Sequence, residues 1–193
     1  MIRRLEVSVR KLEKGLFEHC APTLAGIKCA GLFNYYHDGE SLVREEVQEI
    51  NRLINEKGVY VEVLKMRTDS ALIYIYRPAM LEEALGKSGV FDLLLKYGYK
   101  SGDADYCIRR LKSKFISSSC FPHEIGIFLG YPLEDVKGFI ENAGRNCECC
   151  GAWKVYCNSE EKVKLFAQIK KCKDVYTKLF FEGVGISKMT VCT

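Results

Sequence analysis

The sequence predicts a helix-rich α+β fold in which helices pack against a small sheet. Three observations predict this class. Apolar residues recur at helical spacing over much of the 193-residue chain. Strand character is confined to a hairpin at about 59–76 and a strand at about 152–157. Because strands and helices do not alternate regularly, a doubly wound parallel sheet is excluded.

The first third of the chain is predicted to be mainly helical. Apolar residues among 3–17 repeat at helical spacing between charged ones. Pro22 lacks the N–H that a helix interior needs, so it is expected to separate this helix from a second, mostly apolar helix at 24–33. A third, amphipathic helix is expected at 43–54 and should stop before Gly58.

The two strands of the hairpin are predicted from β-branched residues at 59–66 and 71–76, and Pro78 ends the second strand. Beyond it, helices are predicted at about 79–85, 90–97, 103–115, 123–129 and 133–142, and a last long helix begins at Ser159. Residues 183–193 are predicted to form an extended C-terminal tail.

The composition is that of an ordinary globular protein. With 48% hydrophobic residues, 28% charged residues and four prolines, the chain is not disordered, collagen-like or a disulfide-stapled miniature. No low-complexity linker divides it, so 1–193 is expected to be a single globular domain. The formal net charge of +4 is too small to predict a polyanionic partner, and nucleic acid is not expected.

The sequence predicts a cytoplasmic protein. No run of about 18 apolar residues occurs, so no membrane partner is expected. Charged residues follow Arg3 and Arg4 and interrupt the apolar segment that a signal peptide needs. In a reducing compartment the ten cysteines are expected to be small buried residues, metal ligands or reactive thiols rather than disulfides.

Three segments of the chain together resemble a bacterial family catalogued as a domain of unknown function, number 3793. They are HCAPTLAGIK at 19–28, FPHEIGIFLGYP at 121–132 and GAWKVY at 151–156. The resemblance implies a small cytosolic bacterial protein, supports a single domain, and brings no established activity. The cysteines at 147–150 lie outside the three segments that carry the resemblance.

The junction around Cys20 is the first candidate site. Cys20 precedes Pro22 and the predicted apolar helix, which would place its sulfur at a helix N-terminus, where free amides and the helix dipole favour a thiolate. His123, at another predicted helix start, is the candidate general base, and Glu124 is the candidate orienting group. The alternative is that Cys20 is a small core residue and His123 a capping or surface residue.

Two cations form a candidate anion site. Lys28 lies in the predicted apolar helix, where an unpaired ammonium would be costly, and Arg77 lies at the end of the hairpin, where strands often open onto a cleft. With Thr23 they make up the predicted ligand-binding set, and the predicted partner is an anionic small molecule or a peptide terminus. The alternative is a snorkelling lysine and a surface arginine.

Two further segments suggest other chemistry. Four thiols, those of Cys147, Cys149, Cys150 and Cys157, would satisfy a tetrahedral zinc site, but they lack paired C-x-x-C units. Ordinary loop cysteines are therefore favoured over a structural or regulatory metal, and the cofactor stays open. Residues 123–140 fit a helix-turn-helix, but Glu134 and Asp135 at the start of its second helix would repel phosphates, which favours a helical hairpin without DNA binding.

Aromatic residues gather near the strand at 152–157. Trp153, Tyr156 and Phe166 are expected in the core, with the lining of a ligand pocket as the alternative. The resulting hypothesis is a small-molecule or peptide-binding protein, with acyl or thiol transfer if Cys20 is activated. The alternative is a regulatory module without catalysis, either a metal or ligand sensor using the Cys147 region or a DNA-binding protein using 123–140.

Overall fold

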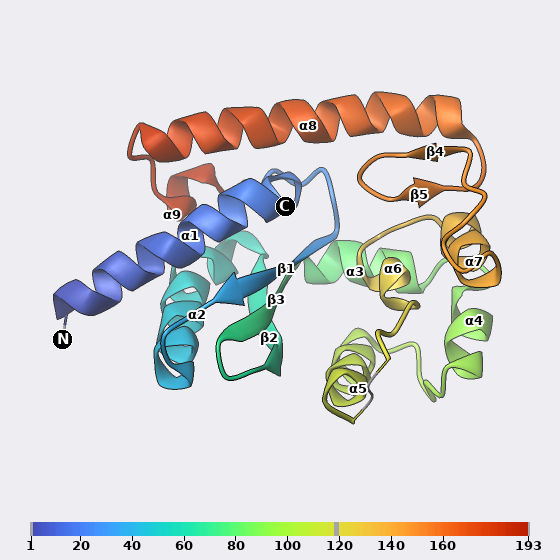
Figure 1. The fold of residues 1–193 in the computed structure, drawn as a ribbon, viewed down its shortest axis with the longest axis horizontal. Coiled ribbons are helices and arrows are strands. Elements are labelled where there is room, and N and C mark those ends of the chain that lie inside the picture. Colours follow the sequence, from blue (N-terminus) through green and yellow to red (C-terminus); the bar gives the residue numbers. More distant parts are fainter. Residues whose placement is uncertain (1, 118–119, 193) are drawn as a thin grey trace. The chain divides into compact units, whose positions relative to one another are not determined.

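The computed structural model describes residues 2–117 and 120–192, and the chain separates into two compact units. Unit 1 comprises Met1–Ala79 and Cys172–Thr193, and unit 2 comprises Met80–Lys171. Figure 1 shows the course of the chain through both units. Unit 2 is therefore one continuous segment, whereas unit 1 is assembled from two segments that flank it in the sequence.

Unit 1 is built on a three-stranded antiparallel sheet. Its strands are β1 (Ala30–Tyr36), β2 (Tyr60–Met66) and β3 (Ser70–Tyr76), in the order β1-β3-β2. Phe33 of β1 and Val63 of β2 both lie opposite Ile73 of β3. The predicted hairpin is formed by β2 and β3, and the sheet with its many helices confirms the α+β class.

Strand β1 corrects the prediction of a helix at 24–33. The first helix, α1 (Ile2–Leu24), includes Pro22 in its last turn. Gly26 follows with a φ of 73°, a left-handed conformation that commonly terminates a helix. The prediction was wrong because a short, uniformly apolar run suits a buried strand as well as a buried helix.

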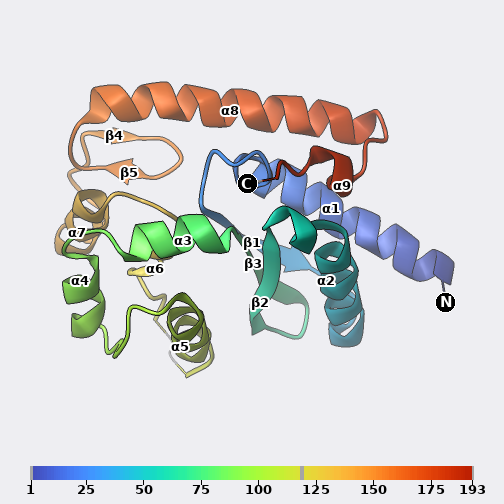
Figure 2. The same ribbon diagram turned by 180° about the vertical axis from the view of Figure 1, so that it is seen from behind.

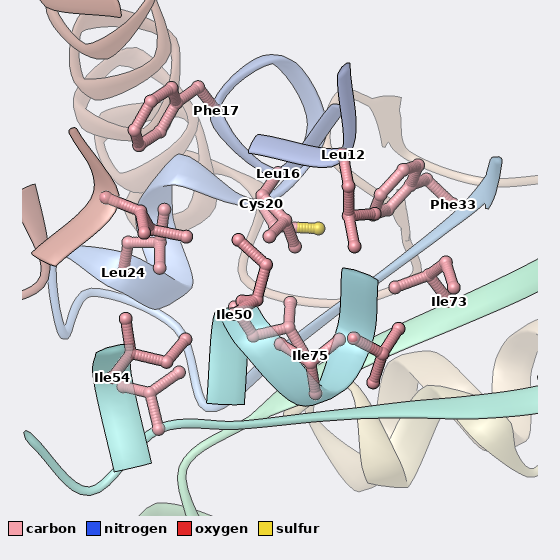
Figure 3. Close-up of a cluster of buried hydrophobic side chains, with 14 of the residues drawn as sticks. Leu12, Leu16, Phe17, Cys20, Leu24, Phe33, Ile50, Ile54, Ile73 and Ile75 are labelled. Atoms are coloured by element: carbon pink, nitrogen blue, oxygen red, sulfur yellow. The ribbon is translucent and has the colours of Figure 1, made fainter. Parts of the chain in front are cut away.

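Two helices pack against the sheet of unit 1. Helix α2 (Glu40–Ile54), followed by the 3-10 helix η1 (Asn55–Lys57), connects β1 to β2, while β3 inserts between these two strands as in a split β-α-β arrangement. Contacts join α1 with β1 and α2, and α2 with β2. Side chains from both helices and from the sheet form one apolar core (Figure 3), which includes Leu16, Cys20, Phe33, Ile50 and Ile75.

The C-terminal segment completes unit 1. Helix α8 (Ser159–Phe181) begins in unit 2 and ends in unit 1, and a short helix, α9 (Ile186–Met189), follows it. Ile186 is fully buried, and the backbone N–H of Val191 donates to the carbonyl of Leu24 at 3.0 Å. The prediction of an extended tail at 183–193 is wrong over 186–189, because the core covers apolar residues of this turn.

Unit 2 is mainly helical. Besides the start of α8, it contains α3 (Pro78–Leu85) except for the first two residues of that helix, which belong to unit 1. Its other elements are α4 (Val90–Lys96), α5 (Ala104–Ser117), α6 (Ile125–Phe128), α7 (Leu133–Glu141), β4 (Cys149–Cys150) and β5 (Lys154–Val155). Strand β5 falls within the predicted strand at 152–157, but it pairs with β4 in a separate hairpin and not with the sheet of unit 1. Figure 2 shows this hairpin beside α7.

Candidate ligand-binding pocket

A cavity of about 420 Å³ lies within unit 2. The loop before α6, α6 itself, α7 and β5 all contribute to it. It is lined by Phe121, His123, Ile125, Gly126, Leu129, Tyr131, Asp135, Val136, Phe139, Trp153 and Lys154. This volume falls within the range of roughly 300–1,000 Å³ that is typical of small-molecule sites.

Aromatic rings form much of the pocket wall. Tyr131 and Trp153 stack with their ring centroids 4.8 Å apart and their planes at 24°. The ring of His123 lies 5.3 Å from that of Phe139 and 6.4 Å from that of Phe121. Of the three aromatic residues considered from the sequence, Trp153 lines the pocket, whereas Tyr156 and Phe166 do not belong to its lining.

The close approach of α6 and α7 depends on Gly126. A Cβ at this position would lie 2.7 Å from a methyl group of Val136 and 3.3 Å from the ring of Tyr131. Gly130, with a φ of 73°, makes the turn between the two helices, and α7 begins directly after Pro132. The predicted helical hairpin is thus present, and its inner side forms the floor of the pocket.

Asp135 fastens the β4–β5 hairpin to α7. Its buried carboxylate accepts hydrogen bonds from Trp153 Nε1 at 2.8 Å and from the backbone N–H of Tyr156 at 2.7 Å. Cys157 Sγ lies 3.9 Å from the same carboxylate. These bonds orient the indole of Trp153 in the pocket wall, and they occupy both carboxylate oxygens and the indole N–H.

Two nitrogen-bearing side chains complete the lining. Lys154 donates from Nζ to the carbonyl of Gly144 at 2.6 Å. His123 is exposed to solvent, and its ring nitrogens have no hydrogen-bond partner among the residues that the structure describes. The pocket therefore combines apolar walls with an ammonium, an imidazole, the Tyr131 hydroxyl and the hydrogen-bonded carboxylate of Asp135.

Cys20 does not lie at a helix N-terminus, contrary to the expectation from the sequence. It belongs to the last two turns of α1, because that helix continues through Pro22. Its side chain points into the apolar core of unit 1 (Figure 3) and is 1% exposed. Burial raises the pKa of the Cys20 thiol to about 12, outweighing the opposing effect of Lys28. These surroundings favour the neutral thiol over the thiolate.

We expect Cys20 to be the slowly reacting thiol in a limited alkylation experiment. At pH 8 a thiol with a pKa of about 12 is a thiolate in roughly one molecule in 10,000. Labelling with iodoacetamide, read by mass spectrometry, should modify exposed Cys150 at least about 100-fold faster than Cys20. A guanidinium-denatured sample, in which both react alike, is the control. Fast labelling of Cys20 with a plateau below pH 8 would instead show an activated nucleophile.

The other two candidate catalytic residues belong to unit 2, whereas Cys20 belongs to unit 1. Glu124 is buried, accepts a hydrogen bond from the Tyr99 hydroxyl at 3.3 Å and forms an ion pair with Lys114. Its carboxylate thus connects the start of α6 to α5 and Tyr99. His123, by contrast, faces the pocket.

Arg77 is fully buried rather than exposed at the mouth of a cleft. Its Nε donates to the carbonyl of Thr23 at 2.7 Å, and its Nη2 donates to those of Leu24 at 2.7 Å and Val191 at 2.8 Å. Carbonyls at a helix C-terminus lack hydrogen-bond donors within the helix, and Arg77 supplies donors to those of Thr23 and Leu24. Of the residues predicted to bind an anion, Arg77 and Thr23 are thus in contact. Their contact joins the end of α1 to the C-terminal segment.

Lys28 lies in the loop before β1, not in a helix. Burial lowers the pKa of its ammonium to about 8, although the thiols of Cys20 and Cys29 act in the opposite direction.

The candidate metal ligands lie on or beside the β4–β5 hairpin. Cys149 is opposite Val155 and Cys150 is opposite Lys154, so the adjacent thiols project to opposite faces of the hairpin. Cys147 precedes β4, and Cys157 lies near Asp135. Across 2–117 and 120–192, no group of three or more His, Cys, Asp or Glu side chains is arranged to hold a metal ion.

Comparison with known proteins places most of the chain in one family. Residues 16–190 match the family model described as "Protein of unknown function (DUF3793)", which confirms the resemblance of the three sequence segments. No curated protein and no solved structure matches the chain. In the described part of the chain, no helix is both long and apolar enough to cross a membrane.

Proposed function

Because the chain belongs to the DUF3793 family, whose description assigns no activity, we propose from the pocket alone that this protein binds a small, largely apolar molecule. The observation that carries the proposal is the aromatic-lined cavity of about 420 Å³ in unit 2. Aromatic walls supply a large apolar contact area, and a few polar groups orient the ligand, as in many small-molecule sites.

The side chains of the pocket favour binding over catalysis. Its lining includes no Ser, Thr or Cys that would serve as a nucleophile. Asp135, the carboxylate in the lining, is buried and accepts hydrogen bonds from Trp153 and Tyr156, which favours a structural role for it. The acyl or thiol transfer considered for Cys20 would need a thiolate that the core of unit 1 disfavours.

The cytoplasmic location expected from the sequence is carried on in this proposal. The ten cysteines are free thiols, which supports the cytoplasm as the site of action. A metal sensor at Cys147, Cys149, Cys150 and Cys157, or a DNA-binding function at 123–140, gains no support from the described residues.

The pocket carries its own reporter, because Trp153 is the single tryptophan of the chain. Titration with N-phenyl-1-naphthylamine, a neutral aromatic probe, is expected to quench Trp153 emission by energy transfer, saturating at one probe per chain. Removal of a pocket wall in Phe139→Ala should weaken binding about fivefold.

A matched variant controls for general effects of losing a phenylalanine. Phe91→Ala removes a partly exposed ring of the same unit that does not line the pocket, and the probe affinity should stay unchanged. Binding that does not saturate, or equal losses in Phe139→Ala and Phe91→Ala, would refute the pocket as the binding site.

A further inference from the structure

Resting on the proposed function, we infer that the ligand of this pocket is an amphipathic anion: an apolar, aromatic body with a carboxylate or similar acidic group that Lys154 and His123 bind. The inference depends on which polar groups of the lining are already paired and which retain hydrogen-bonding capacity.

The carboxylate in the lining already accepts hydrogen bonds from the protein. Asp135 receives hydrogen bonds from Trp153 Nε1 and the Tyr156 N–H, and Cys157 Sγ lies nearby. The indole N–H, which is a donor only, is used by the same contact. These contacts hold the hairpin on α7. Each oxygen of Asp135 already accepts one N–H from the hairpin, and the indole has no second donor for a ligand.

Donor capacity remains at Lys154 and His123. An ammonium has three hydrogens, and Lys154 uses one on the carbonyl of Gly144 at 2.6 Å. In the described chain no carboxylate pairs with this ammonium. The exposed imidazole of His123 also retains its donor, because its ring contacts are with the apolar rings of Phe121 and Phe139.

An anion is the ligand charge that fits this arrangement. An acidic group on Lys154 gains a charge-assisted hydrogen bond beside an apolar wall, where water screens it less than in the open. Aromatic walls also attract quaternary ammonium ligands. However, the Lys154 ammonium in the same lining would repel such a cation, and the Asp135 carboxylate that would attract it is 2% exposed and already bonded to the hairpin. The cationic alternative is therefore disfavoured.

A matched pair of probes tests the charge. 8-Anilinonaphthalene-1-sulfonate has the body of N-phenyl-1-naphthylamine plus a sulfonate. Lys154→Met is expected to weaken binding of the sulfonate about tenfold and to leave that of the neutral probe within twofold. Raising the NaCl concentration from about 0.05 to 0.5 M should weaken binding of the sulfonate probe and leave that of the neutral probe unchanged. His123→Gln should act in the same sense, with a smaller loss.

Two controls separate charge from structure. Lys137→Met removes an exposed lysine of α7 that is outside the lining and should change neither affinity. Lys154→Arg keeps the charge and should retain most of the sulfonate affinity, even if Lys154→Met loosens the contact with Gly144.

The outcomes for the two proposals are distinct. If neither probe binds saturably to the unmodified protein, the proposed binding function fails. If both bind and Lys154→Met weakens both equally or neither, the pocket stands and the inference of an anionic ligand is overturned.

Discussion

Replacing Arg77 with methionine is expected to destabilise unit 1 by about 3–5 kcal/mol. The guanidinium is fully buried and donates to the carbonyls of Thr23, Leu24 and Val191. Methionine fills a similar volume but donates to none of these carbonyls. Those of Thr23 and Leu24 keep the backbone N–H groups of Gly26 and Val191, whereas the Val191 carbonyl loses this donor. Each hydrogen bond from a charged group contributes about 1.5–3 kcal/mol. Urea unfolding followed by far-UV circular dichroism measures the loss.

Hydrogen exchange should locate the effect of Arg77→Met in α1, β1 and the segment around Val191. Arg77→Lys keeps the charge but loses the planar fork, and we expect it to lose at least half as much stability. Arg44→Met, which removes an exposed arginine of α2, should change stability by less than about 0.5 kcal/mol. If Arg77→Met behaves like Arg44→Met, the three hydrogen bonds do not hold the C-terminal segment.

Asp135→Ala is expected to cost about 2–4 kcal/mol and to abolish probe binding in the pocket. The substitution leaves the Trp153 indole N–H and the Tyr156 backbone N–H without their acceptor. The hairpin should then loosen from α7, and Trp153 should lose its stacking on Tyr131. A red shift of Trp153 emission, together with loss of N-phenyl-1-naphthylamine binding, measures both effects.

The neighbouring carboxylate provides the control for Asp135. Glu134→Ala removes an exposed carboxylate from the same turn of α7 and should leave the emission and the affinity unchanged. An Asp135→Ala protein that keeps the emission maximum and the probe affinity of the unmodified protein would show that the hairpin is held by packing alone.

Much of the fold follows from local sequence signals. The hairpin of β2 and β3 is predictable because its β-branched residues are bounded by turn residues and proline. Strand β1 escapes prediction because its apolar start has no period that distinguishes a strand from a helix. The position of Pro22 misleads as well, because proline is expected to break a helix and here falls in the last turn.

The candidate site is less accessible to sequence reasoning, because its contacts join distant residues. His123 and Trp153 are identifiable as chemistry-bearing side chains, and both line the pocket. The role of Asp135 depends on partners 18 and 21 positions away. Arginine is usually a surface residue, so the sequence predicts an exposed Arg77. The residue is buried because the end of α1 presents carbonyls that need donors.

The division of unit 1 into two chain segments also sets the order in which the protein assembles during synthesis. The whole of unit 2 leaves the ribosome before residues 172–192 are available. Until then the nascent chain lacks α9, and Arg77 lacks its acceptor on Val191. Unit 1 therefore cannot be completed until all of unit 2 has been synthesised, although most of unit 1 is translated first.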